Sequence, residues 1–189
     1  MNANAVCGYL WLTWWLLWIT LAFGSKKTQQ REGLGTRLAY IFVAWLAMYI
    51  FLSARGLSSW LRTDVVPYHA WMGWLGIAIT ALGFALTFWA RAVLGSNWSG
   101  NVTIKVDHEL IRTGPYRYVR HPIYTGIIVA LIGTAVARDQ WRGVIAIILL
   151  WVSFTIKRLK EEQFMRQTFG SQYVAYSKTT GAILPRAGR

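Results

Sequence analysis

Two adjacent acidic residues, Glu161 and Glu162, are the strongest candidates for chemistry in this sequence. The chain has only 7 Asp and Glu among 189 residues, and these two follow closely on a long apolar run. His121 and Pro122 stand at the start of the preceding apolar run, and Tyr124 comes two residues later. If both runs cross a membrane, the start of one and the end of the other lie on the same face. The five side chains can therefore share one site.

Such a site suits a zwitterionic nucleoside cofactor. Carboxylates bind an ammonium or a ribose, aromatic rings stack on a purine, and basic side chains bind a carboxylate. A simpler interpretation is a solvated helix end, in which Arg158, one helical turn before the acids, forms an ion pair with them. The residues alone leave both interpretations open.

Other catalytic patterns are missing from the sequence. It has no Walker loop, no G-x-G-x-x-G after a strand and no H-E-x-x-H helix. Three scattered histidines and the single Cys7 make a metal site improbable, and no Ser lies in a nucleophile elbow. We therefore expect no metal and no nucleophilic triad.

Composition indicates a membrane protein. The net charge of +13 raises the question of nucleic acid, but only 14% of residues are charged and 55% are hydrophobic. Mean hydropathy is +0.35. These values predict an all-α integral membrane protein and exclude a soluble nucleic-acid binder.

Five uncharged runs predict about five transmembrane helices. The first three have 19, 17 and 24 residues, close to the roughly 20 that cross a bilayer. The last two have 16 and 14 residues and are joined by a short polar turn at 138–140, which predicts a helical hairpin. The runs lie at 5–23, 38–54, 67–90, 122–137 and 143–156.

Basic residues predict the orientation. With five spans, the segments 24–37, 91–121 and 157–189 share one side and carry 16 of the 20 Lys and Arg. The positive-inside rule then places the N-terminus outside and the C-terminus in the cytoplasm, in a bacterial inner membrane or its equivalent. We divide the chain into helices one to three at 1–90 and a cofactor-binding region at 91–189. The second region holds helices four and five and a cytoplasmic C-terminal helix.

Four tryptophans on the first run and a polar loop after the third add detail. Trp11, Trp14, Trp15 and Trp18 recur at roughly helical spacing, which indicates a lipid-facing or packing stripe rather than a cofactor site.

Further on, residues 102–106 alternate apolar and polar side chains, which predicts a short extended segment.

The second half of the chain resembles the isoprenylcysteine carboxyl methyltransferase family, within the group that includes phospholipid N-methyltransferases. The resemblance covers about residues 94–185. The matching elements are His108-x-Leu-Ile, Gly-Pro-Tyr116, Arg120-His-Pro-x-Tyr124-x-Gly126, Glu161-Glu162 and Phe169-Gly170-x-x-Tyr173-x-x-Tyr176. Each is weak alone, but their order between two short spans is specific.

This resemblance implies S-adenosylmethionine as methyl donor, S-adenosylhomocysteine as product, and a cytoplasmic cofactor pocket built from the C-terminal half. The cofactor contacts that it implies are Thr103, His108, Leu110, Ile111, Tyr116, His121, Pro122, Ile123, Tyr124 and Glu161. Thr103 aligns only across a gap. The partners implied are a lipophilic or prenylated substrate and the bilayer.

The resemblance also implies a basic residue that holds the substrate carboxylate. Family members place an Arg just before the acidic pair, and here that position falls on Lys157 or Arg158. We prefer Arg158 for its bidentate guanidinium and assign it a catalytic role. A carboxylate acceptor needs no general base, so positioning and desolvation supply most of the rate enhancement. An amine acceptor would need a base, and Glu162 is the candidate.

Two other functions compete with this one. The acceptor could be a phospholipid amine or another small hydrophobic amine. Alternatively, the chain could be a non-enzymatic membrane scaffold or a transporter, although no charged residue lies well inside a predicted span, as ion pathways usually require.

Overall fold

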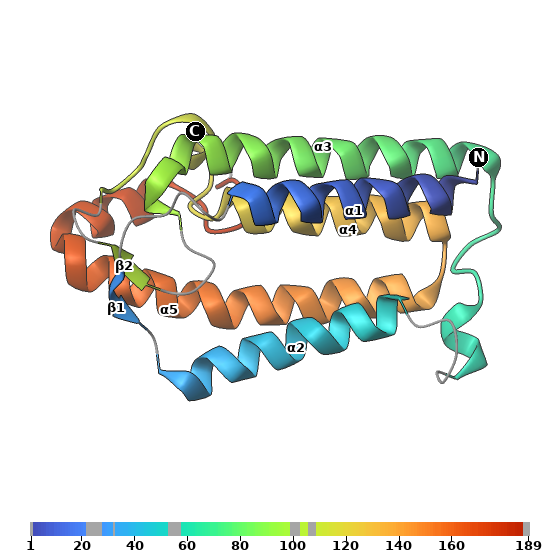
Figure 1. The fold of residues 1–189 in the computed structure, drawn as a ribbon, viewed down its shortest axis with the longest axis horizontal. Coiled ribbons are helices and arrows are strands. Elements are labelled where there is room, and N and C mark those ends of the chain that lie inside the picture. Colours follow the sequence, from blue (N-terminus) through green and yellow to red (C-terminus); the bar gives the residue numbers. More distant parts are fainter. Residues whose placement is uncertain are drawn as a thin grey trace.

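The computed structural model describes residues 2–21, 28–31, 33–52, 58–98, 103–105 and 109–186. Within these ranges the chain is mainly helical, and the helices run roughly along the long axis of the molecule (Figure 1). The helices are α1 (Ala3–Leu21), α2 (Leu34–Leu52), α3 (Ala70–Leu94), α4 (Pro122–Arg138) and α5 (Trp141–Thr179). Short 3-10 turns lie at Ser59–Arg62, Gly95–Asn97 and Gly114–Arg117. The predicted all-α class is confirmed, with one small addition.

That addition is a two-stranded antiparallel sheet at one end of the bundle. It pairs β1 (Thr28–Arg31) with β2 (Thr103–Lys105). The alternation at 102–106 predicted β2, whereas its partner strand in the segment between α1 and α2 had no comparable pattern.

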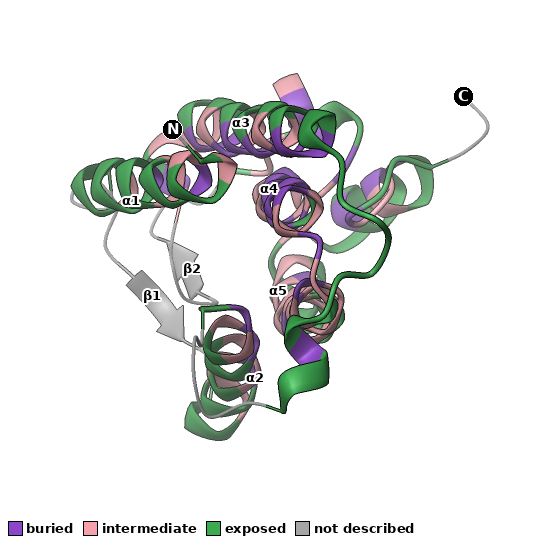
Figure 2. Ribbon diagram, turned by 90° about the vertical axis from the view of Figure 1, so that its right-hand side faces the viewer, coloured by how far each residue is buried: buried purple, intermediate pink, exposed green. Residues whose placement is uncertain are grey.

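The closest helix contact is between α3 and α4, where glycines leave no room for a side chain. A Cβ on Gly126 would lie 2.6 Å from the Gly83 carbonyl oxygen, and one on Gly133 would lie 2.6 Å from the Gly76 carbonyl oxygen. Small residues let membrane helices approach this closely and gain dispersion contacts. Buried residues therefore concentrate where α3 faces α4 (Figure 2).

Helix α1 packs on this pair through two indole hydrogen bonds. Trp11 Nε1 donates to Thr134 Oγ1 (2.9 Å), and Trp14 Nε1 donates to Thr87 Oγ1 (2.8 Å). Trp14 is 5% exposed while Trp15 is 49% exposed, so the tryptophans form a packing stripe with one member facing outward.

Helices α2 and α5 form the other side of the bundle, below α1, α3 and α4 in Figure 1. The hydroxyl of Ser153 on α5 donates to the backbone carbonyl of Tyr40 on α2 (2.8 Å). Helix α5 then continues past the predicted end of the fifth span, with a break at Gly170 (φ 48°, ψ −123°). The expected cytoplasmic C-terminal helix is thus an extension of α5 itself.

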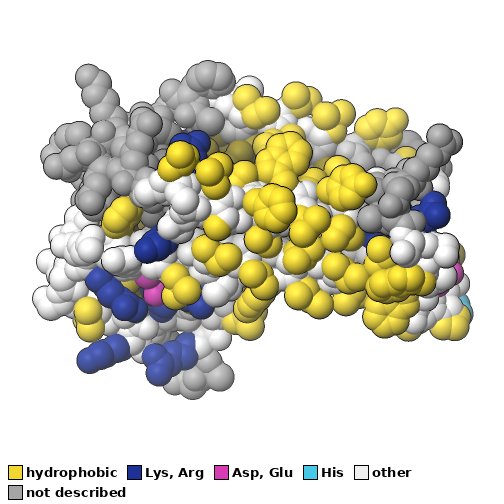
Figure 3. Space-filling view, turned by 90° about the horizontal axis from the view of Figure 1, so that it is seen from below, with side chains coloured by type: hydrophobic (Ala, Val, Ile, Leu, Met, Phe, Trp, Pro, Cys, Tyr) yellow, Lys and Arg dark blue, Asp and Glu magenta, His cyan; other side chains and the backbone are white. Residues whose placement is uncertain are grey.

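Helix lengths and surface character define an integral membrane protein. Ala3–Leu21, Leu34–Leu52 and Ala70–Asn97 are long and apolar enough to cross a membrane, and α4 is a shorter apolar helix. Hydrophobic side chains gather over the middle and right of the face seen in Figure 3, and most Lys and Arg on that face gather toward the left end. The polar turn at 138–140 joins α4 to α5 as predicted, while the count of five spans stays a prediction.

Residues 180–184, here called the C-terminal strap, bind the start of α4. The backbone N–H groups of Arg120 and His121 donate to the carbonyls of Gly181 (2.9 Å) and Ala182 (3.0 Å). The Thr125 hydroxyl donates to the Ile183 carbonyl (2.6 Å). Pro122, at the first helical position, has no N–H that needs a partner. The strap carbonyls accept hydrogen bonds from the N–H groups of the two residues before it.

Candidate active site

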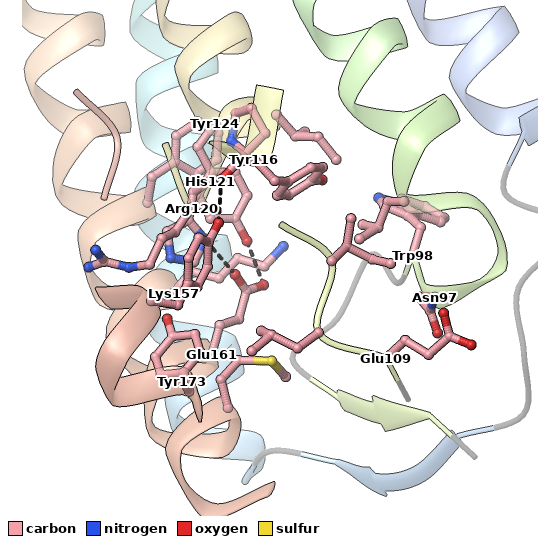
Figure 4. A pocket seen from close by; sticks show the side chains of 18 of the residues that line it. Asn97, Trp98, Glu109, Tyr116, Arg120, His121, Tyr124, Lys157, Glu161 and Tyr173 are labelled. Carbon is pink, nitrogen blue, oxygen red and sulfur yellow. Dashed lines mark hydrogen bonds and ion pairs between the residues drawn. The ribbon is translucent and has the colours of Figure 1, made fainter. Parts of the chain in front are cut away.

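A polar pocket of about 240 Å³ opens where α4 begins and α5 passes beside it. Its walls come from the end of α1, the turn after α3, the segment 109–121, the first turns of α4 and the middle of α5. Figure 4 shows Tyr124, His121, Lys157 and Glu161 on one side, with Trp98 and Asn97 across from them. Segments far apart in sequence thus enclose one space.

Most of the expected cofactor residues lie together in this pocket. The lining includes Leu110, Ile111, Tyr116, His121, Pro122, Ile123, Tyr124, Glu161 and Lys157. Thr103 lies in β2, and its side chain, like all of His108, falls outside the described residues. Arg158 and Glu162 lie beside the pocket rather than in its lining.

Glu161 is the acid that faces the pocket. Its Oε1 accepts a hydrogen bond from the Tyr124 hydroxyl (2.5 Å), and its Oε2 lies 3.3 Å from His121 Nδ1. Burial raises the pKa of this carboxyl, but the hydrogen bond from His121 and the charge of Lys157 outweigh burial and hold the pKa below its usual value. The pocket therefore contains a fixed negative charge.

Glu162 lies outside the pocket lining and is 4% exposed. Its Oε1 accepts from Arg120 Nη2 (2.9 Å) and lies 3.2 Å from His121 Nε2. Arg158 and Arg166 each lie 3.7 Å from the same carboxylate. Burial raises its pKa, but the hydrogen bonds from His121 and Arg120 lower it to about 2. The ion pair expected between Arg158 and the acids is present.

His121 connects the two acids. Burial lowers the pKa of the imidazole, but its hydrogen bonds to Glu161 and Glu162 raise it by more, so the net shift is upward. The ring also stacks on Tyr124 at 5.4 Å between centroids. An imidazolium held between two carboxylates has a fixed orientation and fixes theirs.

Several lining residues were not among the sequence candidates. They include Trp18, Asn97, Trp98, Glu109, Arg120, Phe154 and Tyr173. Arg120 and Tyr173 belong to the pattern that carries the family resemblance. Trp18, Asn97 and Trp98 had no comparable signal, because their approach depends on how α1 and α3 pack.

Asn97 offers a test of what the pocket binds. Its side chain is 8% exposed, and its Oδ1 has no hydrogen-bond partner among the described residues. A buried acceptor without a partner is costly, so a ligand N–H is the natural complement. A zwitterionic nucleoside has both an amino group that can donate to Asn97 and a cationic group that can pair with Glu161. Among the described residues no three His, Cys, Asp or Glu side chains gather as metal ligands.

An apolar cavity of about 330 Å³ adjoins the polar pocket. Ile127 and Phe154 line both spaces, so the two meet at these side chains. The remaining walls come from α1, α2, α4 and α5: Trp11, Trp14, Trp15, Ala44, Trp45, Ala47, Met48, Phe51, Leu131 and Leu150. A polar head and a lipophilic tail can therefore occupy adjoining spaces.

Comparison with known proteins identifies the class. A profile of the phospholipid methyltransferase family matches residues 71–172, which span α3, α4 and most of α5. The chain is thus an integral membrane methyltransferase of this class.

Individual relatives narrow the assignment. A probable protein-S-isoprenylcysteine O-methyltransferase of Oryza sativa subsp. indica is 30% identical over 170 residues, which cover 88% of this chain and 86% of the rice protein. Protein-S-isoprenylcysteine O-methyltransferase B of Arabidopsis thaliana is 29% identical over 62% of this chain and 61% of its own length. The Saccharomyces cerevisiae enzyme is 32% identical over 59% of this chain and 48% of its own length. The chain belongs to the isoprenylcysteine carboxyl methyltransferase family.

A solved structure shares the fold. The eukaryotic intramembrane Ras methyltransferase, isoprenylcysteine carboxyl methyltransferase, aligns with a TM-score of 0.56 and 23% identity. The alignment covers 82% of this chain and 53% of that one. At this identity the likeness establishes the fold alone.

Proposed function

We propose that this protein uses S-adenosylmethionine to methylate the carboxylate of an isoprenylcysteine-like substrate at the cytoplasmic face of a membrane. The observation that carries the proposal is the junction at Phe154 and Ile127. There a polar pocket with a fixed charge at Glu161 meets an apolar cavity. An amphipathic acceptor and a polar donor need that combination.

The polar pocket has groups suited to the donor. Glu161 would hold an ammonium or ribose hydroxyls, and Asn97 Oδ1 would accept a hydrogen bond from an amino group. Tyr116 and Tyr124 supply aromatic surface. When bound, S-adenosylmethionine supplies an electrophilic methyl group on a sulfonium, and S-adenosylhomocysteine is the product.

Existing hydrogen bonds favour a carboxylate acceptor over an amine. An amine must lose a proton, whereas a carboxylate is already a nucleophile at neutral pH. Glu161 already accepts hydrogen bonds from Tyr124 and His121, and Glu162 lies outside the lining. The other carboxylate in the described lining, Glu109, is exposed and lies across the pocket from Lys157 (Figure 4).

Geometry favours Lys157 over Arg158 as the group that binds the acceptor carboxylate. Lys157 lines the polar pocket one turn after Phe154, which lines both spaces. Arg158 lies 3.7 Å from Glu162, outside the lining, and supports that acid. Positioning by Lys157 and exclusion of water by the apolar wall are the contributions of this chain.

The proposal also covers the path of the substrate's prenyl tail and the orientation of the protein in the membrane. A prenyl tail would reach the apolar cavity laterally from the bilayer. Basic residues gather toward the end of the molecule that holds the pocket (Figure 3), which supports a cytoplasmic pocket and C-terminus with the N-terminus outside. A bacterial inner membrane stays a prediction, because the relatives compared are eukaryotic.

Titration calorimetry of the detergent-purified protein with S-adenosylhomocysteine tests the donor. We expect saturable binding that weakens about 100-fold or more in Glu161→Ala, since a buried charged contact is lost. Asp64→Ala, an exposed acid at the other end of the bundle, is the matched control. No binding by a folded, monodisperse sample would refute the proposal and favour a scaffold.

Methyl transfer to farnesylcysteine, with phosphatidylethanolamine as the amine comparison, tests the acceptor. Labelled methyl groups transferred to a carboxylate form an ester that alkali hydrolyses to volatile methanol, whereas methylated amines withstand the same treatment. We expect alkali-labile product from farnesylcysteine only. Alkali-stable product from the amine lipid would overturn carboxylate specificity.

A further inference from the structure

Helix α2 contributes one aromatic ring beside the polar pocket. The Nζ of Lys157 lies 5.4 Å from the ring centroid of Tyr40 on α2 and 5.4 Å from that of Tyr124 on α4. Both distances are within the range of cation–π attraction. The ammonium group therefore lies within cation–π distance of two aromatic rings from two different helices.

Tyr40 is itself fixed in place. Its side chain is 5% exposed, and its backbone carbonyl accepts a hydrogen bond from Ser153 (2.8 Å). Ser153 lies one helical turn before Lys157, so one face of α5 both holds the backbone of Tyr40 and presents the lysine to its ring. Burial of the side chain and the hydrogen bond at the backbone both restrict where the ring can lie.

A lysine at this position needs such a constraint. Its four-carbon chain is flexible, and Glu161 is four residues further along α5, at the spacing that favours an ion pair within a helix. The two rings limit where the ammonium can lie beside that acid.

The face of α2 below Tyr40 leads into the apolar cavity. Ala44, one turn on, and Ala47 and Met48, two turns on, line that cavity. One helix face thus has an aromatic ring beside the cation, followed by small and apolar residues beside the tail space. This order matches a ligand with a carboxylate at one end and a lipophilic chain at the other.

We infer that Tyr40 is a positioning residue for the acceptor: it holds the Lys157 ammonium at the junction of the polar pocket and the apolar cavity, where the carboxylate of the lipophilic substrate binds. The inference rests on the proposed function. It assigns α2 a direct part in acceptor selection, beyond forming a wall of the cavity.

Binding of farnesylcysteine to protein saturated with S-adenosylhomocysteine tests the inference. We expect Tyr40→Leu to weaken farnesylcysteine binding about tenfold, with S-adenosylhomocysteine affinity changed less than twofold. Tyr40→Phe keeps the ring and restores binding. Phe42→Leu, on the same helix but 68% exposed, is the matched control. Unchanged farnesylcysteine binding in Tyr40→Leu, or equal losses in the Phe and Leu variants, would overturn the inference.

A second measurement separates this inference from the proposed function. Amine-reactive labelling followed by peptide mapping reports how accessible Lys157 is without any substrate. We expect labelling of Lys157 to change severalfold in Tyr40→Leu and to stay at the wild-type rate in Tyr40→Phe. Wild-type protein that fails to bind farnesylcysteine would refute the proposed acceptor, whereas unchanged labelling in Tyr40→Leu would refute the contact itself.

Discussion

The polar pocket and the apolar cavity are neighbours but are held together differently. Around the pocket, Glu161, Glu162 and His121 have directional partners, most within 3.3 Å. Around the cavity, the indole N–H groups of Trp11 and Trp14 donate to threonines on other helices. These two side chains therefore contribute ring surface, and no free hydrogen-bond donor, to the cavity wall. One region is defined by hydrogen bonds and charge, the other by shape.

This difference indicates how selective each region is. A network of buried hydrogen bonds rejects a ligand that leaves any member unpaired. An apolar cavity discriminates weakly, because one methylene more or less changes binding by only about 1–3 kcal/mol. We therefore expect strict selection of the donor and tolerance toward the length of the acceptor tail.

The largest expected effect is the loss of the charge on Glu162. Glu162→Gln leaves the Arg120 guanidinium buried without its counter-ion, a change that costs about 3–5 kcal/mol. Thermal unfolding in detergent measures it. Glu109→Gln, at an exposed acid, is the control and should change stability by about 0.5 kcal/mol or less. Equal unfolding temperatures for both variants would remove the contrast between the regions.

Filling the apolar cavity should affect only the acceptor. Met48→Trp adds bulk inside it, and we expect the KM for farnesylcysteine to rise about tenfold, equivalent to about 1.4 kcal/mol, with donor affinity unchanged. Leu46→Trp on the outer surface of the same helix is the control. A parallel loss of S-adenosylhomocysteine binding would show that the two regions are not independent.

Titration of His121 should produce a smaller, pH-dependent effect. Its pKa is raised above 6.5 by Glu161 and Glu162, so its contribution to stability is complete below pH 6.5 and declines as pH rises through the folded-state value. The carboxylates contribute above pH 4.5 and lose that contribution as pH falls, toward about 2 for Glu162. Stability should therefore be greatest between pH 4.5 and 6.5.

Thermal unfolding as a function of pH checks this prediction. We expect a loss of stability on the alkaline side that is absent in His121→Gln and retained in His69→Gln at the other end of the bundle. An identical alkaline decline in all three proteins would exclude His121 as its source.

The smallest expected effect concerns the C-terminal strap. Thr125→Val removes the hydroxyl that donates to the Ile183 carbonyl and should cost about 1 kcal/mol. Hydrogen exchange and thermal unfolding measure the change. Thr168→Val, whose exposed hydroxyl bonds only within its own helix, should have almost no effect. Equal effects of the two changes would show that the strap adds nothing to the polar region.

The polar region was the more predictable of the two. The order of His121, Tyr124 and Glu161 along the chain, with one hairpin between them, places them together once both segments are helical. Titratable side chains are scarce in an apolar chain, so these residues can be recognised from the sequence. Glu162 and Arg158 carried the same signal, but a helix turns about 100° per residue, so they face away from the pocket while Glu161 and Lys157 face it.

The apolar cavity could not be predicted in the same way. Its walls include Trp11 and Met48, and nearly every residue on those helices is apolar, so no pattern separates the cavity face from the lipid face. The choice depends on how far α2 stands from α1 and on small residues such as Gly126 that draw α3 and α4 together. Tyr40 was missed because a tyrosine in an apolar span has many ordinary explanations.

The C-terminal strap has a consequence for the synthesis of the protein. Chains are synthesised from the N-terminus and insert helix by helix, so α4 is in place before residues 180–184 leave the ribosome. Until then the N–H groups of Arg120 and His121 lack the partners that Gly181 and Ala182 provide. The start of α4 therefore gains these backbone hydrogen bonds only after α5 and the strap have been synthesised, and a chain that stops before residue 180 lacks them.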